Sequence, residues 1–168
     1  MKKMFLSMAI FFALSFCASI IEAATQNLFK IERNKNANVV MYDVVLNDKG
    51  LVDDKNPIDA YWLLFAKDGG REEIGSFEKK AYGYTAVKKN GTYFLTLKAV
   101  SDRSIKIVIS KGVAKGEIMI NDKPAYLSKV YVFASAAFIP TVKYYTLTGI
   151  DIETGTQVEE QIDAVKSK

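Results

Sequence analysis

The feature that most constrains the fold is the alternation of apolar and polar residues. Ile105, Ile107 and Ile109 share one face of an extended segment, and serine and lysine side chains occupy the other face. A period of two is typical of a strand with one face on a core and one in water. Asn90-Gly91 predicts a two-residue hairpin, because both central positions of the favoured turn need a positive φ. The chain is therefore expected to be mainly β.

Similar runs recur along the chain, separated by residues that favour turns. The expected strands cover residues 28–33, 39–47, 59–66, 84–88, 92–99, 104–110, 114–120, 126–134 and 142–150. Further reversals are expected at Lys111-Gly112 and at 121–124. We predict a meander of antiparallel strands, folded as a β-sandwich or a flattened β-barrel of about eight or nine strands, since either arrangement removes exposed edges.

One helix is expected, over residues 71–82. Ile74, Phe77 and Ala81 fall on one side at helical spacing, acidic residues open the segment, lysines close it, and Gly83 stands where a helix would stop. The segments 39–42 and 61–65 are apolar on both faces, which predicts strands that are central or covered. The predicted helix would supply the cover.

Residues 1–23 have the pattern of an export signal. Lys2 and Lys3 precede an apolar run over 4–21, and Ala23 offers a small residue for cleavage. A retained membrane anchor is the competing interpretation, because the run has about the length of a span. Lipidation at Cys17 is disfavoured, because the residue before the cysteine is the bulky Phe16. We expect a single antiparallel β domain over 24–168, periplasmic or extracellular, with no stable transmembrane anchor after cleavage.

Composition restricts the chemistry of this domain. The chain has no histidine, and its single cysteine lies in the expected signal. Histidine catalysis, cysteine nucleophiles, zinc sites of the usual ligand types and disulfides are therefore excluded from residues 24–168. These residues keep 21 of the 23 basic and 18 of the 19 acidic side chains, with the signs mixed along the chain. No basic stripe indicates a nucleic-acid partner.

A first group of candidate ligand-binding residues lies between positions 32 and 43. It comprises Glu32, Arg33, Asn36, Asn38 and Asp43. Asp43 stands in an otherwise apolar strand, where an unpaired carboxylate is costly. We expect an ion pair between Asp43 and Arg33 that locks the first hairpin, and a binding or catalytic role for Asp43 is the alternative.

A second group of candidates is aromatic. Tyr61 and Trp62, with Tyr82 and Tyr84 further on, combine apolar rings with polar tips, which suits a groove for sugars or peptides and suits a core equally well. The loop 47–56 is rich in oxygen ligands, but its spacing does not match a calcium loop, and a solvated turn is expected. We predict no metal site and no cofactor.

Several short motifs together point to a known family. They are Ile31-Glu32-Arg33, Asn36-Ala37-Asn38, Tyr42-Asp43, Asn56-Pro57-Ile58, Tyr61-Trp62 and Ala81-Tyr82-Gly83. In this combination the chain resembles the domain-of-unknown-function family numbered 4833, which is found in exported bacterial proteins. The resemblance covers nearly all of residues 24–168. It implies a single exported domain and supplies no mechanism.

Three functions remain compatible with these observations. The leading hypothesis is a non-enzymatic binding or interaction domain of the bacterial cell envelope, whose ligand or protein partner the sequence does not identify. The alternative is a histidine-free hydrolase of an envelope glycan or peptide, in which Asp43 or Glu32 acts in a groove lined by Tyr61, Trp62 and Tyr82. The third is a structural subunit of an envelope assembly.

Overall fold

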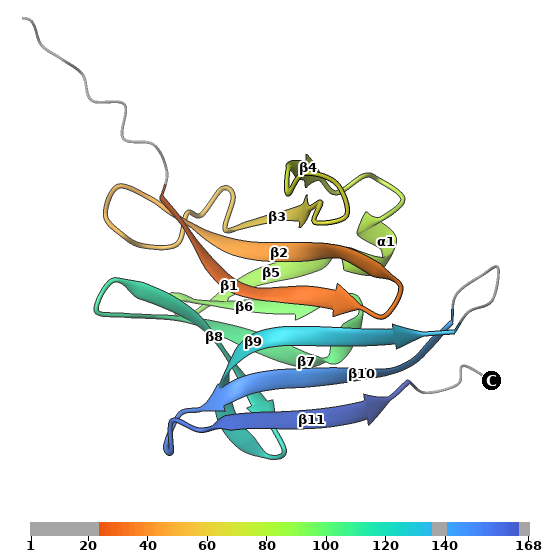
Figure 1. Ribbon diagram of the computed structural model, residues 1–168. Coiled ribbons are helices and arrows are strands. Elements are labelled where there is room, and N and C mark those ends of the chain that lie inside the picture. The colour runs from red at the N-terminus through yellow and green to blue at the C-terminus, as the bar shows by residue number, and fades with distance from the viewer. Residues whose placement is uncertain (1–23, 136–140, 165–168) are drawn as a thin grey trace, which may run out of the picture.

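The computed structural model describes residues 24–135 and 141–164, and most of these residues are in β-strands (Figure 1). The expected signal, residues 1–23, lies outside this part of the chain. In chain order the elements are β1 (Ala24–Arg33), β2 (Asn36–Leu46), β3 (Ile58–Leu63), β4 (Arg71–Glu73), α1 (Lys79–Tyr82), β5 (Tyr84–Lys89), β6 (Thr92–Leu97), β7 (Val100–Ser110), β8 (Val113–Ile120), β9 (Lys123–Ala134), β10 (Val142–Asp151) and β11 (Gln157–Asp163).

Strand β9 is the branch point of the sheet. It pairs along its length with β10, which in turn pairs with β11. A strand has two edges, so the opposite edge of β9 is shared by β8, which pairs with its first half, and β1, which pairs with its second half. Two arms leave this edge, β1-β2-β3-β4 and β8-β7-β6-β5, and Figure 1 shows the second arm behind the first.

The hydrophobic core fills the space between the two arms. On the first arm the rings of Phe29 and Tyr42 are stacked, with their centroids 4.7 Å apart, and Tyr42 meets Tyr84 of the second arm edge to face. The buried apolar side chains include Ile31, Val40, Val44, Leu95, Ile105, Ile118, Leu127, Val130 and Leu147. The curled sheet thus forms a half-barrel with its apolar faces inward.

The predicted fold class, mainly β with the character of a sandwich or flattened barrel, is confirmed. The Asn90-Gly91 hairpin joins β5 to β6, and both turn residues have a positive φ, 48° and 80°. The predicted antiparallel pairing holds for every neighbouring pair of described strands except β1 and β9, which run parallel. Strands β4 and β11 were not predicted, since β4 has only three residues and β11 is a polar edge strand.

The predicted helix over 71–82 is wrong for most of its length. Its first residues form β4, which pairs with β3, and only Lys79–Tyr82 is helical. The expected apolar face is split, because Ile74 is buried at 5% exposure whereas Phe77 is 80% exposed. Pairing with an open sheet edge outweighed the weak helical periodicity, and Gly75 lies in the turn that follows.

Within residues 24–135 and 141–164, no helix has the length and apolar character that crossing a membrane requires.

Candidate functional site

A cleft lies where the two arms fail to meet. Strands β4 and β5 are the two ends of the curled sheet, and the cleft, with a volume of about 540 Å³, separates the β3–β4 side from α1 and the start of β5. Its lining residues are Asn56, Ile58, Asp59, Ala60, Glu73, Ile74, Lys79, Tyr82, Gly83, Tyr84 and Lys98. We call it the seam cleft.

Tyrosine side chains connect the walls of the seam cleft. The hydroxyl of Tyr84 donates a 2.7 Å hydrogen bond to the carbonyl of Ile58, and the hydroxyl of Tyr42 donates a 2.6 Å bond to the carbonyl of Tyr82. Burial raises the pKa of the hydroxyls of Tyr42, Tyr82 and Tyr84 above the usual 10, so all three stay neutral at physiological pH. Two hydrogen bonds therefore connect β2 with α1 and β5 with β3 around the cleft.

Next to the seam cleft, Arg33 packs against two aromatic rings that also contact each other. Its guanidinium carbon is 4.7 Å from the ring centre of Trp62 and 5.5 Å from that of Tyr82, and Nη1 donates a 2.7 Å hydrogen bond to the Tyr82 hydroxyl. Trp62 and Tyr82 themselves meet edge to face at 5.1 Å. In the described residues, the buried Nε of Arg33 and Nε1 of Trp62 have no hydrogen-bond partner.

A smaller cavity of about 160 Å³ opens beside this stack. It is lined by Arg33, Asn36, Asn38, Trp62, Leu64, Lys67, Glu72 and Glu78. Both asparagines accept backbone hydrogen bonds, since Oδ1 of Asn36 accepts the N–H of Asn38 and Oδ1 of Asn38 accepts the N–H of Ala66. The structure thus brings together Arg33, Asn36, Asn38, Trp62 and Tyr82 from the candidate residues.

The predicted ion pair between Asp43 and Arg33 is wrong. Asp43 is 7% exposed and accepts hydrogen bonds from Nδ2 of Asn27 at 2.8 Å and from the hydroxyl of Tyr61 at 2.9 Å. Arg33 is opposite Asn36, and Asp43 is seven positions further along β2, roughly 23 Å along a strand. Neutral donors, not a cation, therefore satisfy the buried carboxylate.

The remaining candidates lie outside the seam cleft and the smaller cavity. Glu32 forms ion pairs with Lys30 at 2.6 Å and with Lys129 at 3.8 Å. Tyr61 and Trp62 are neighbours on one strand and point to opposite faces of the sheet. The structure therefore does not assemble Glu32, Asp43 and Tyr61 with Trp62 and Tyr82 in one groove.

Two carboxylates of the oxygen-rich loop 47–56 are already engaged in hydrogen bonds. Oδ1 of Asp53 accepts the N–H groups of Lys55 and Asn56, both at 2.8 Å. Asp54 accepts from Lys88 and Tyr93, and these hydrogen bonds lower the pKa of Asp54. Among residues 24–135 and 141–164, no group of three or more potential ligands is arranged to hold a metal ion.

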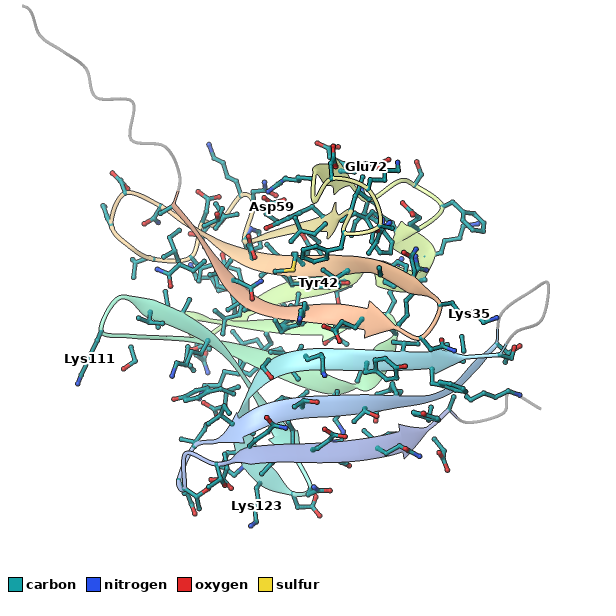
Figure 2. The ribbon with its side chains drawn as sticks, viewed as in Figure 1. Lys35, Tyr42, Asp59, Glu72, Lys111 and Lys123 are labelled. Carbon is teal, nitrogen blue, oxygen red and sulfur yellow. The ribbon has the colours of Figure 1, made fainter. Side chains whose placement is uncertain are left out.

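Four charged residues of the seam cleft were missed by the sequence interpretation. Asp59 and Glu73 lie on the β3–β4 side, and Lys79 and Lys98 lie on the other side. Arg71 holds Asp59 through a 2.6 Å ion pair and covers the ring of Tyr61 at 3.8 Å. In Figure 2, Asp59 and Glu72 lie on the same side of the molecule. No local pattern signals this grouping, because it depends on how the arms curl.

The residues that line both cavities lie within a match to a known family. A family model described as a domain of unknown function, DUF4833, matches residues 29–161. The chain belongs to this family. The DUF4833 match runs from β1 into β11 and includes every residue of the seam cleft and of the Arg33 stack. Comparison with curated proteins and with solved structures gave no significant match.

Proposed function

We propose that this DUF4833 protein is a non-catalytic binding domain of the bacterial cell envelope, which takes its ligand in the seam cleft. The observation that carries the proposal is the cleft itself. Its volume of about 540 Å³ falls in the range of ordinary ligand sites, about 300–1,000 Å³. The envelope location rests on the signal-like pattern of residues 1–23.

The lining of the seam cleft suits recognition. Tyr82 and Tyr84 supply aromatic surface with polar tips, which is common where one side of a contact is apolar and the other is wet. Lys79 and Lys98 face a wall that contains Asp59 and Glu73. Such a mixed charge pattern fits a neutral or zwitterionic ligand better than a strongly charged one.

The hydrolase hypothesis relies on Asp43 or Glu32, and neither carboxylate lines the seam cleft. Asp43 is held by Asn27 and Tyr61 away from the cleft, and Glu32 is engaged by lysines. Within the cleft, Asp59 is paired with Arg71. Carboxylate-based hydrolysis needs two carboxyl groups poised on either side of the scissile bond. These contacts favour binding as the function.

Trp62 provides a test of the proposal. It is the single tryptophan of the chain and contacts Tyr82, which lines the seam cleft. The purified domain is titrated with three probes prepared from bacterial envelope: soluble peptidoglycan fragments, a peptide pool and a protein pool. We expect one of them to change the emission of Trp62 in a saturable manner.

Charge reversal provides the matched control. Lys98→Glu alters the cleft, whereas Lys123→Glu makes the same change on an exposed residue that Figure 2 places at the opposite side of the molecule from Asp59. The proposal expects Lys98→Glu to weaken the effective probe and Lys123→Glu to leave it unchanged. It is contradicted when no probe changes the emission, or when both variants respond alike.

A further inference from the structure

The first wall of the seam cleft is an unpaired strand edge. Strand β4 pairs with β3 only from Tyr61 to Leu63, because the chain leaves the sheet at Ile74, whose side chain turns into the core. The half of β3 that begins at Ile58 therefore has β2 on one side and the seam cleft on the other. This unpaired edge of β3 lies in the middle of the cleft wall.

The register identifies which groups of β3 face the cleft. The N–H of Val45 donates to the carbonyl of Pro57 at 3.0 Å, so alternate residues from Pro57 onward direct their backbone groups to β2. Ile58 and Ala60 therefore direct theirs to the seam. The carbonyl of Ile58 accepts the Tyr84 hydroxyl. In the described chain, the N–H groups of Ile58 and Ala60 have no backbone partner.

The second wall is also a free edge. The N–H of Lys98 donates to the carbonyl of Gly83 at 2.9 Å, which fixes the alternation of β5 relative to β6. Tyr84, Ala86 and Lys88 consequently direct their N–H and C=O groups away from β6. Within residues 24–135 and 141–164, these six groups have no backbone partner. Free groups of this kind are a template for another strand.

We propose that the seam cleft binds an extended peptide segment of a partner protein, which adds as a strand between β5 and β3. This inference rests on the proposed function and names the chemical class of its ligand. Donors and acceptors recur along each edge at every second residue, about 6.8 Å apart, and an extended peptide backbone has the matching repeat. A glycan lacks this alternating repeat of amide donors and carbonyl acceptors.

The side chains around the edges agree with a peptide ligand. One wall carries Asp59 and Glu73 and the other carries Lys79 and Lys98, which disfavours a ligand with a large charge of either sign. Side chains of an added strand alternate between its two faces. The side chains on one face of the peptide would contact the aromatic surface of Tyr84 and its neighbours. The peptide is therefore expected to carry apolar residues at every second position.

The test begins with a phage-displayed library of random twelve-residue peptides, selected against the whole described domain. The selected peptides are then synthesised with a single N-methyl group at each position in turn. Strand addition between two edges predicts that one alternate set of peptide N–H groups bonds to β5, and that the intervening N–H groups bond to the shorter free edge of β3. Methylation of an N–H that meets either edge should weaken binding by about tenfold, because it removes a backbone donor. Ala60→Pro should abolish the effect of methylation only in the set that faces β3. Methylation without effect at every position would overturn the proposal.

Proline variants test the protein side. Ala86→Pro removes a donor from the β5 edge, and Ala60→Pro removes one from the β3 edge without touching the ladder with β2. Gln161→Pro is the matched control, because the 2.9 Å bond from the N–H of Ala164 to the carbonyl of Lys143 places the N–H of Gln161 on the free edge of β11. We expect about tenfold weaker peptide binding for both cleft variants and unchanged binding for the control. Using two independent cleft variants, each checked by its melting curve, guards against loss of fold in one of them.

The outcomes separate the inference from the proposed function. Binding of peptidoglycan fragments in the cleft with no selected peptide would overturn the peptide proposal and leave the binding function standing. No binding by either probe would overturn both. A concentration-dependent dimer that Ala86→Pro abolishes would show that a second copy of this chain occupies the edge, which also contradicts the peptide proposal.

Discussion

The guanidinium of Arg33 lies 4.7 Å above the indole ring of Trp62 and is hydrogen-bonded to the hydroxyl of Tyr82. This contact joins the end of β1 to β3 and to the short helix α1. It therefore fixes one end of the seam cleft, since Tyr82 is also part of the cleft lining.

Replacing Arg33 should destabilise the protein. Arg33→Met removes the cation–π contact and the hydrogen bond to Tyr82, and we expect a loss of about 1–3 kcal/mol in the free energy of unfolding. Arg33→Lys keeps the charge but lacks the planar guanidinium group, so it should restore only part of the lost free energy of unfolding. Urea unfolding followed by Trp62 emission measures both variants. An unchanged midpoint for Arg33→Met would show that the stack contributes nothing.

Asp43 should couple to Tyr61 and not to Arg33. Tyr61→Phe removes one of the donors to a buried carboxylate and should cost about 1–2 kcal/mol. In double-mutant cycles, Asp43→Asn and Tyr61→Phe should show a coupling energy of about 1 kcal/mol, whereas Asp43→Asn and Arg33→Met should be additive within about 0.5 kcal/mol. Coupling between Asp43 and Arg33 would contradict the observed pairing.

The ion pair of Arg103 with Glu160 should make stability depend on pH. Arg103 donates to both carboxylate oxygens of Glu160 at 2.6 and 2.7 Å, and the N–H of Asn121 adds a third bond. These contacts, the Arg103 bonds first, lower the pKa of Glu160 below its usual 4.5. The folded state then binds fewer protons than the unfolded state, so this stabilisation is present above the unfolded pKa and is lost as the pH falls through the folded one.

The comparison variant is Glu160→Gln. Because both side chains are partly exposed, we expect it to be less stable than the parent by only about 1–2 kcal/mol near neutral pH. The gap should stay constant down to about pH 5 and then narrow as the acid limit is approached. Equilibrium unfolding of both proteins across this range measures the gap. A gap that widens toward acid would contradict the assignment.

The elements that could be predicted from sequence are those with local causes. Asn90-Gly91 and Lys111-Gly112 form turns because their residues tolerate a positive φ, and Ile105 and Ile107 are buried because a strand alternates its faces. Residues 71–82 carried weak signals for a helix, and pairing of β4 with β3 outweighed them. The parallel pairing of β1 with β9 has no local signature.

The candidate site was predictable to a similar degree. Trp62 and Tyr82 stood out as amphipathic aromatics, and the structure places them together beside Arg33. The predicted partner of Asp43 was wrong, because Arg33 pairs with Asn36 at the start of β2, far along the strand from Asp43. The open strand edges at Ala60 and Ala86 carry no side-chain signal, because their chemistry lies in the backbone.

Amide hydrogen exchange followed residue by residue in NMR spectra is the most direct test of the open seam. The account predicts alternation along β5: the amides of Thr85 and Val87, which pair with β6, should exchange at least about tenfold more slowly than those of Tyr84 and Ala86, which point to the open edge of β5. Ala60 should exchange as fast as Ala86. Equal protection of Tyr84, Thr85, Ala86 and Val87 would mean that the edge of β5 is already paired, and would contradict the account.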